Sequence, residues 1–298
     1  MIKKQDYPES FSHVPVMMEE VISLLKIIPE GTYLDGTIGL GGHSNSILSQ
    51  LSEKGHLIGI DRDVQALEIC KKRILTKHSN FSLLKGSYSS IQNILDQLGV
   101  LEVNGMLLDL GLSSFQLDNH KRGFSFKTNG NLDMRFDNCQ KISAFDIINK
   151  FSEKEIADMI FVYGEERRSR RIARKIVQLR PMATTFDLVE AIQKSTPPKN
   201  RIKSIARVFQ AIRITVNDEL KKLEDFMNVF CKRLCVGGRV VLISFHSLED
   251  RMIKHGFRML EKQKKLRILT KKPLYPTEFE SKQNIRSRSA KLRAAEKI

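Results

Sequence analysis

The feature that most constrains the fold is a glycine-rich segment followed, one strand later, by an acid. Gly39, Gly41 and Gly42 fall within four residues, between an apolar run that ends at Asp35 and a segment of helical pattern. A second apolar run ends at Asp61, about 20 residues further on. A glycine turn at a helix start lets a ligand approach free backbone N–H groups, and an acid at the next strand tip accepts hydrogen bonds from a ribose diol. The pattern predicts a nucleoside-cofactor site.

The details of this segment favour S-adenosylmethionine (AdoMet) as the cofactor. The dinucleotide fingerprint G-x-G-x-x-G requires a third glycine, where this chain has Ser44. Asp35, four residues before Gly39, would repel a pyrophosphate but suits a cation. AdoMet carries a sulfonium, an ammonium and a ribose diol, and no phosphate. Asp35 and Gly39 are therefore candidate cofactor-binding residues, with NAD or FAD as the alternative cofactor.

The alternation of expected strands and helices along the chain predicts a right-handed parallel α/β sheet interrupted by a helical insertion. A first helix begins at or just after Pro15. Strands are expected at 32–35, 56–61, 81–85 and 103–108, and helices at about 44–51, 64–75 and 90–98. Helical patterns then cover 145–150, 153–163, 167–179, 185–195 and 202 onward, with Ser152 and Glu155 as a capping pair. A helix at about 216–234, a strand at 237–245, a helix at 246–260 and a closing hairpin at 267–270 and 289–293 return to the sheet. We expect a sheet domain in residues 1–114 and 216–298 and an inserted all-helical domain in 115–215.

Charge and composition limit the classes of molecule that this protein is expected to bind. The formal charge is +16 and the pI about 9.7, which favours a polyanion, nucleic acid first and a membrane surface second. Basic stretches at 163–175 and in the tail, 282–297, also favour a polyanionic partner. No apolar run approaches the ~18 residues that span a bilayer, and no apolar segment follows the N-terminal lysines. We expect a cytoplasmic protein with no membrane partner.

The cysteines do not indicate a metal centre. Cys70, Cys139, Cys231 and Cys235 are scattered, and no His/Cys cluster accompanies the last two, which are four residues apart on the expected helix. We expect reduced thiols and no metal site.

Chemistry is expected where the strands end. The first, second and fourth strands end in Asp35, Asp61 and Asp109, and ligands of open α/β sheets bind beyond the carboxyl ends of the strands. Asp109 could bind the amino-acid part of the cofactor, accept a hydrogen bond from a substrate amine, or only cap the following loop. Methylation of an exocyclic amine needs acceptors for the N–H hydrogens, because the nitrogen lone pair is delocalised into the base. Asp109 and the carbonyl groups of the turn from Gly111 to Ser114, including Ser113, could supply them.

A second polar cluster follows the later strand, at Ser244–Arg251. Phe245 could stack on a base, and His246 could pair with a phosphate or shuttle a proton. The same residues also fit a helix start with Ser247 as N-cap and Asp250 at N3, and both interpretations can hold. Asp109, Ser113 and His246 are therefore the candidate catalytic residues.

Many ordered blocks resemble one family along nearly the whole chain, the 16S ribosomal RNA (cytosine N4)-methyltransferases called MraW or RsmH. The blocks are His13-x-Pro15-Val16, Asp35-Gly36-Thr37, Gly41–Ser44, Gly59–Asp63, Asp109–Asp118, Arg122–Phe126, Leu132–Arg135, Tyr163–Arg167, Phe209–Ile214, Ser244–Arg251 and Arg286–Ser289.

The resemblance implies a class I (Rossmann-like) AdoMet-dependent methyltransferase sheet with an inserted substrate-recognition domain. It implies N4-methylation of a cytidine in the decoding region of 16S rRNA, with the RNA or the small ribosomal subunit as partner. The cofactor contacts that it implies fall on Gly41, Gly42, His43, Asp61, Tyr88, Asp109 and Gln116, with Tyr88 where phenylalanine is common. An amino-methyltransferase acting on another RNA or DNA base and a non-catalytic RNA-binding assembly factor stay open, as does the oligomeric state, for which a homodimer is one expectation.

Overall fold

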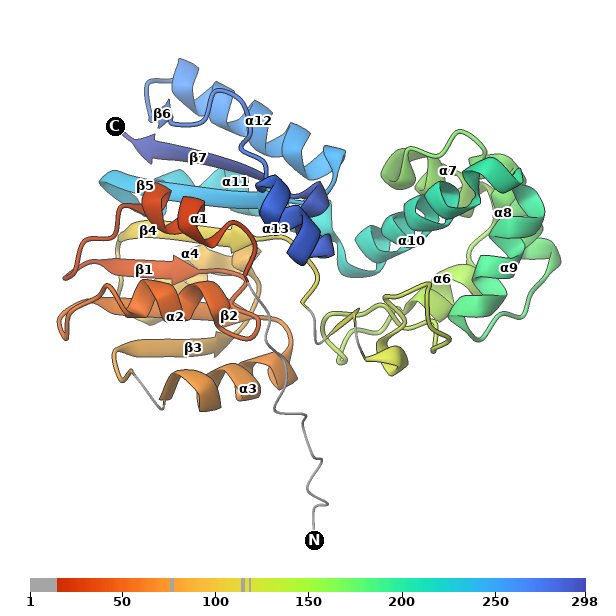
Figure 1. Ribbon diagram of the computed structural model, residues 1–298, viewed down its shortest axis with the longest axis horizontal. Helices are drawn as coiled ribbons and strands as arrows, with labels where there is room; N and C mark the ends of the chain where they lie inside the picture. Colours follow the sequence, from red (N-terminus) through yellow and green to blue (C-terminus); the bar gives the residue numbers. More distant parts are fainter. Residues whose placement is uncertain (1–14, 76–77, 114–115, 118) are drawn as a thin grey trace, which may run out of the picture.

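The computed structural model describes residues 15–298 except 76–77, 114–115 and 118. A seven-stranded sheet runs in the order β3-β2-β1-β4-β5-β7-β6 (Figure 1). Five parallel strands are followed by β7, which is antiparallel to both β5 and β6. The strands are β1 Thr32–Asp35, β2 His56–Asp61, β3 Phe81–Lys85, β4 Val103–Asp109, β5 Leu234–Ser244, β6 Leu266–Ile268 and β7 Lys291–Lys297. The parallel α/β sheet predicted from the rhythm of the chain is confirmed.

Helices cover both faces of this sheet, because its central strands are apolar on both sides. In β4, Met106 and Leu108 enter the core on one face and Leu107 the core on the other. The first face is covered by α4 Ile91–Gln97, α11 Glu219–Val229 and α12 Ser247–Lys262. The second is covered by α1 Met18–Leu25, α2 Gly42–Leu48 and α3 Val64–Leu75. Burial on both faces fixes the carboxyl ends of the strands as one rigid edge.

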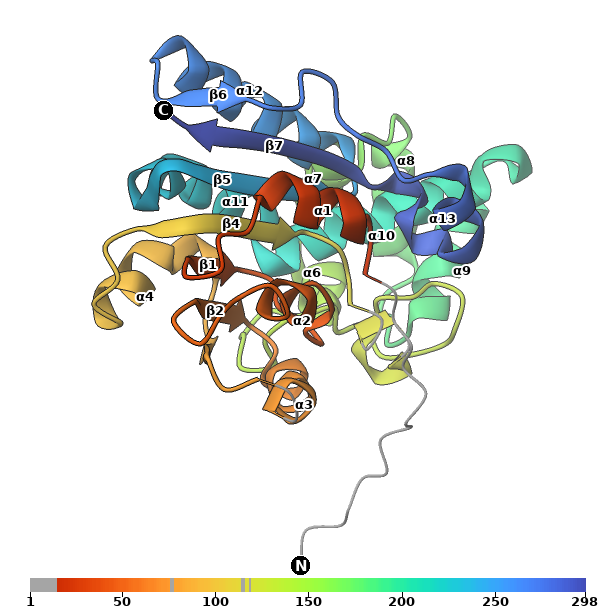
Figure 2. The same cartoon turned by 60° about the vertical axis from the view of Figure 1, so that its left-hand side comes forward.

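A group of helices inserted after β4 has a hydrophobic core of its own and lies beside the sheet (Figures 1 and 2). Three of these helices begin with capping boxes, and the expected cap of Ser152 with Glu155 is confirmed. α10 continues to Asn217, two residues beyond the expected boundary at 215, so the extent of the inserted domain stays a prediction. The helices are α6 Ala144–Lys150, α7 Glu153–Gly164, α8 Ser169–Gln178, α9 Thr185–Ser195 and α10 Arg201–Asn217.

Two sequence-based expectations near the end of the chain are wrong. The single helix expected at 216–234 is interrupted at Asp218, whose φ of 52° is left-handed and ends α10 before α11 begins. The next strand begins at Leu234 instead of 237, because Leu234 already pairs with Val103 of β4. Cys231 and Cys235 therefore lie on a 3-10 turn and a strand, and do not share a helix.

The closing hairpin is confirmed in outline, but β7 covers Lys291–Lys297, later than expected. The chain between β6 and β7 carries α13 Glu278–Gln283 and the 3-10 helix η5 Ile285–Ser289. Within the described residues, no helix combines the length and the apolar character that crossing a bilayer requires.

Candidate functional site

The glycine segment forms a cradle between β1 and α2. Gly39 and Gly41 have φ values of 51° and 81°, a region that side chains disfavour. Gly42 begins α2 so close to Pro15 that an added Cβ would lie 2.4 Å from the Pro15 Cγ. A side chain at these positions would strain the turn or displace the segment leading to α1. The glycines are therefore required by the local backbone.

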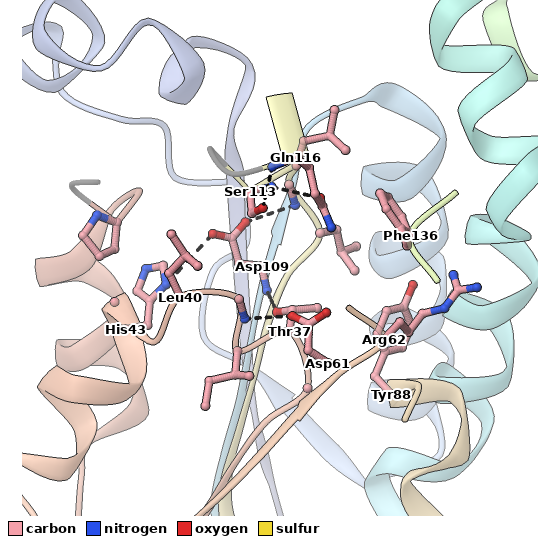
Figure 3. Close-up of a pocket in the computed structure, with 18 of the residues that line it drawn as sticks. Thr37, Leu40, His43, Asp61, Arg62, Tyr88, Asp109, Ser113, Gln116 and Phe136 are labelled. Atoms are coloured by element: carbon pink, nitrogen blue, oxygen red, sulfur yellow. Dashed lines mark hydrogen bonds and ion pairs between the residues drawn. The ribbon is translucent and has the colours of Figure 1, made fainter. Parts of the chain in front are cut away.

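Asp61, at the end of β2, fixes this cradle from the neighbouring strand. Its Oδ2 accepts the Gly39 N–H at 2.8 Å, and its Oδ1 accepts the Asp63 N–H at 2.9 Å. Burial raises the pKa of the carboxyl, while these backbone hydrogen bonds oppose that rise. Asp61 also lines the pocket above the cradle (Figure 3). An acid in this position can orient the loop and still present an oxygen to a ligand.

Across the same pocket, two hydrogen-bond acceptors face each other. The Nε2 of His43 lies 2.9 Å from the Val16 carbonyl, so this nitrogen carries the ring proton and Nδ1 has the free lone pair. Nδ1 lies 4.0 Å from Oδ2 of Asp109. A dashed line marks this pair in Figure 3. Burial lowers the pKa of His43 and keeps the ring neutral. A carboxylate and an imidazole lone pair at this separation suit a ligand group that donates hydrogens to both, such as an ammonium.

Asp35 does not occupy the place expected for it. Its Oδ1 accepts the Thr37 N–H at 3.1 Å, and its Oδ2 accepts the Ser44 hydroxyl at 2.7 Å. The side chain is buried beneath the cradle, and burial raises its pKa to about 6. Neither Asp35 nor Gly41 is among the described residues that line the pocket. The expectation that all three strand-end acids face the pocket is therefore wrong for Asp35, which supports the cradle from below.

The opposite wall combines residues from the sheet and from the insertion. Tyr88 follows β3, packs edge-on against Phe226 with ring centroids 6.1 Å apart, and has its pKa raised by burial. The Arg62 guanidinium lies 5.8 Å from the centre of the Phe136 ring. Sequence reasoning included Tyr88 but missed both Arg62 and Phe136. Arg62 could have been found, because it directly follows Asp61, whereas nothing in the sequence marks Phe136.

Ser113 and Gln116 close the pocket above β4 as one hydrogen-bonded turn. The Ser113 carbonyl accepts the N–H groups of Gln116 and Leu117, both at 3.1 Å. The Ser113 hydroxyl accepts the Gln116 N–H at 3.2 Å, and the Gln116 side chain accepts the Ser113 N–H at the same distance. Because its carbonyl is occupied, Ser113 holds the turn instead of offering an acceptor to an amine. Of the predicted motifs, His13, Ser114, Phe115 and Asp118 lie outside the described residues.

A second pocket adjoins the first, and Leu112 lines both. Four phenylalanines line this second pocket, and the side chains of Gln210, Arg213 and His246 supply polar groups. Its described lining is Leu112, Leu117, Phe124, Phe126, Met134, Ala206, Phe209, Gln210, Arg213, Phe245, His246, Arg286 and Ser289. The expected cluster after the later strand therefore lies beside the cofactor-type pocket, with Phe245 and His246 in the adjoining one.

His246, and not Ser247, caps α12. Its Nδ1 accepts the Glu249 N–H at 3.3 Å, while the Glu249 Oε2 accepts the Phe245 N–H at 2.9 Å. The Ser247 hydroxyl instead donates to Glu165 of the insertion. With Nδ1 engaged as an acceptor, the proton of a neutral ring lies on Nε2, 3.1 Å from the Glu249 Oε1. Nε2 then has no lone pair, so the predicted proton-accepting role does not fit this atom.

Glu219, His246 and Glu249 bring possible metal-ligand atoms within 4.8 Å of one another. Arg213 already donates to both oxygens of Glu219 at 2.8 Å, so a fixed cation compensates that carboxylate. A metal on His246 Nε2 would also require the proton to move to Nδ1, which would break the cap. These contacts oppose a metal at this cluster.

Five parallel strands with a reversed strand beside them, and a cradle shaped for a cationic nucleoside at their carboxyl ends, define a class I AdoMet-dependent methyltransferase. Sequence comparison identifies the family within this class. The chain belongs to the MraW methylase family, whose sequence model matches residues 10–298.

Several curated relatives carry the name ribosomal RNA small subunit methyltransferase H. The protein of Thermotoga neapolitana is 49% identical over 292 residues, which cover 96% of each chain. That of Trichormus variabilis is 48% identical over 97% of this chain and 92% of its own. That of Caldicellulosiruptor bescii is 43% identical over 97% of this chain and 100% of its own. The chain is thus a methyltransferase that matches its relatives over essentially their full length.

Proposed function

We propose that this protein transfers a methyl group from AdoMet to N4 of a cytidine in the decoding region of 16S rRNA, and that it does so in the cytoplasm. The observation that carries the proposal is the meeting of two pockets at Leu112, one suited to a cationic nucleoside and one lined with aromatic rings. The name of the relatives, which specifies ribosomal RNA of the small subunit, supports the choice of RNA.

In the first pocket, the donor's ammonium group would be held between His43 and Asp109, its ribose diol by Asp61 and its adenine against Tyr88. The separation of His43 Nδ1 from Asp109 Oδ2 fits such a cation, because both atoms are acceptors. Gly39, Gly42 and Gln116 line the same space, and Gly41 and Asp35 shape it from beneath. These assignments account for every cofactor residue that the sequence suggested, two of them as indirect supports.

In the second pocket, the target base would lie among the phenylalanines and point its amino group toward Leu112. When bound, AdoMet would supply an activated methyl group to the amine nitrogen, with the thioether as leaving group and the displaced proton passing to solvent. The carbonyls of Gly111 and Leu112 are the candidate acceptors for the N–H hydrogens, since that of Ser113 is occupied. Gln210, Arg213 and His246 offer side-chain donors to the oxygen and ring nitrogen of a pyrimidine.

RNA recognition is proposed to involve the insertion. The exposed side of α8 carries Arg170, Arg171 and Arg174, and the helix is strongly basic along its length. Each phosphate neutralised by such a side chain steepens the salt dependence of binding. We regard residues 115–215 as the substrate-recognition domain on this basis.

The decisive experiment is mass spectrometry of nucleosides from 16S rRNA of cells with and without this protein. N4-methylated cytidine should disappear with the protein and return when it is restored. A methyl group on a different base would favour the alternative amino-methyltransferase, and an unchanged nucleoside profile would favour a non-catalytic assembly factor. The expected homodimer is tested separately by light scattering of the purified protein.

A further inference from the structure

We propose that residues 271–290, here called the C-terminal excursion, bind the single-stranded RNA that flanks the target nucleotide. The inference deepens the proposed function and rests on it. The excursion connects β6 to β7 and contains α13 and η5, so neither the sheet nor the hairpin requires its length.

The position of the excursion makes it one lip of the second pocket. Arg286 and Ser289, from η5, line that pocket together with Ala206, Phe209 and Gln210 of α10. Both views show α13 at the edge of the sheet domain that faces the insertion (Figures 1 and 2). A strand of RNA whose base enters this pocket must therefore pass the excursion.

The excursion exposes four large apolar side chains, of which Leu274 is 39% exposed. Tyr275, Phe279 and Ile285 are 59%, 70% and 63% exposed. The backbone beneath them is nevertheless fixed, because Leu274 exchanges two hydrogen bonds with Leu292 of β7, at 3.0 and 2.9 Å, and Ser287 is fully buried. Aromatic rings presented on a fixed backbone can stack on bases without a large ordering cost.

The net positive charge of the excursion indicates what kind of partner it binds. Five cations lie between residues 271 and 290, against the two acids Glu278 and Glu280, and the Glu280 Oε1 accepts the Met17 N–H at 2.9 Å. Exposed rings among cations are the chemistry that binds single-stranded nucleic acid. A second copy of the chain would bring like charges together and is disfavoured for that reason. The cations are Lys271, Lys272, Lys282, Arg286 and Arg288.

The test compares Phe279→Ala and Tyr275→Ala with Leu101→Ala, a control in the loop before β4 whose side chain is 79% exposed. Small ribosomal subunits from cells lacking this protein are the substrate. For each excursion variant, KM for the subunit should rise about fivefold or more, the lower end of base-stacking effects. The control should leave KM unchanged, and kcat and AdoMet affinity should be unchanged in all three variants, since none of these side chains lines the first pocket.

A second measurement addresses charge. Arg288→Gln should reduce the slope of log affinity for the subunit against log salt by about 0.7. Lys54→Gln, at the opposite edge of the sheet before β2, should leave the slope unchanged.

Three outcomes are distinguishable. An unchanged KM and salt slope, with a wild-type protein that methylates the RNA, overturns the inference and leaves the proposed function standing. A wild-type protein that transfers no methyl group overturns the proposed function itself. A change in oligomeric state of Phe279→Ala with an unchanged KM also overturns the inference, by assigning the surface to a second copy of the chain.

Discussion

Asp63 and Arg122 form a buried ion pair, with the Asp63 Oδ2 3.0 Å from the Arg122 Nη1. Asp63 follows β2, and Arg122 lies near the start of the insertion, in the 3-10 helix His120–Arg122. The Arg122 Nη2 also donates to the carbonyls of Arg135 and Phe136, at 2.8 and 3.1 Å. The pair therefore positions Phe136 in the wall of the first pocket.

Asp63→Asn should destabilise the protein by about 3–5 kcal/mol, because it leaves a buried guanidinium without its countercharge. AdoMet affinity should fall as well, since Phe136 loses its support. Urea denaturation and calorimetric titration measure the two effects. The control is Lys54→Met, which breaks an exposed pair with Glu30 and should change stability by less than about 1 kcal/mol. Equal effects of the two substitutions would contradict the structural role of the pair.

Asp61→Ala should weaken AdoMet binding about 10- to 150-fold, the effect of losing hydrogen bonds to a charged acceptor worth about 1.5–3 kcal/mol. It also frees the Gly39 N–H and loosens the cradle. Calorimetric titration with AdoMet measures this loss, and NADH should show no binding to either protein. Glu68→Gln removes an exposed acid from the neighbouring α3 and serves as the matched control. Unchanged affinity in Asp61→Ala would remove the ribose assignment.

Asp109→Ala should abolish methyl transfer, because the Asp109 Oδ1 also accepts the Gly111 N–H at 3.1 Å and so holds the turn that carries the proposed acceptor carbonyls. The protein should stay folded, since the side chain lines the pocket and does not belong to the core. AdoMet affinity should fall at least about tenfold, since the partner of His43 in holding the ammonium group is lost. Transfer of labelled methyl to ribosomal subunits and a thermal unfolding curve are the two measurements. Full activity in a folded variant would exclude Asp109 from the site.

Asp35 predicts a specific dependence of stability on pH. Its pKa is about 6 in the folded protein and near 3.8 when unfolded. The folded chain therefore binds more protons between these values, so this carboxyl lowers stability as pH rises from about 4 to about 6, by a total of about 3 kcal/mol. Asp35→Asn removes this contribution. As pH rises from about 4 to about 6, the unfolding free energy of the variant should therefore increase relative to that of the wild type. A difference that does not change with pH would contradict this prediction.

The substitution His246→Asn tests separately the two roles of His246, as the N-cap of α12 and as a group acting in methyl transfer. Asparagine is a good N-cap, so α12 and overall stability should be kept, whereas the Nε2–H donor is lost. We expect kcat to fall and the pH dependence of kcat to keep its shape, because the ring is not the proton acceptor. A variant that loses an ionisation from the kcat profile would restore the general-base hypothesis.

Most of the sheet could be predicted from the sequence, because hydrophobic periodicity and local turn residues determine where its strands begin and end. The strands 32–35, 56–61 and 81–85 and the helices 64–75 and 185–195 have the expected bounds. The start of β5 was missed because Leu234 becomes a strand residue only by pairing with Val103, more than a hundred residues away. The cap at His246 was missed for a similar reason, since Ser247 is engaged by Glu165 of the insertion.

In the candidate site too, some residues could be predicted from local sequence and others depend on tertiary contacts. Gly39 and Asp61 could be found because they lie at fixed offsets from strand ends. The burial of Asp35 could not be found, since it depends on the Ser44 hydroxyl turning back beneath the loop. Phe136 could not be found either, because the Arg122 contacts that place it are long-range in the sequence.

The position of β7 has a consequence for synthesis on the ribosome. β7 is the last strand in sequence but lies between β5 and β6, and β6 pairs with no other strand in the described residues. Strands β1 to β5 can associate in parallel as they emerge, whereas β6 must wait as an unpaired segment until β7 arrives. The excursion between them is held at both ends by that late pairing. A nascent chain would thus acquire its donor-binding half before the rim of its acceptor pocket takes shape.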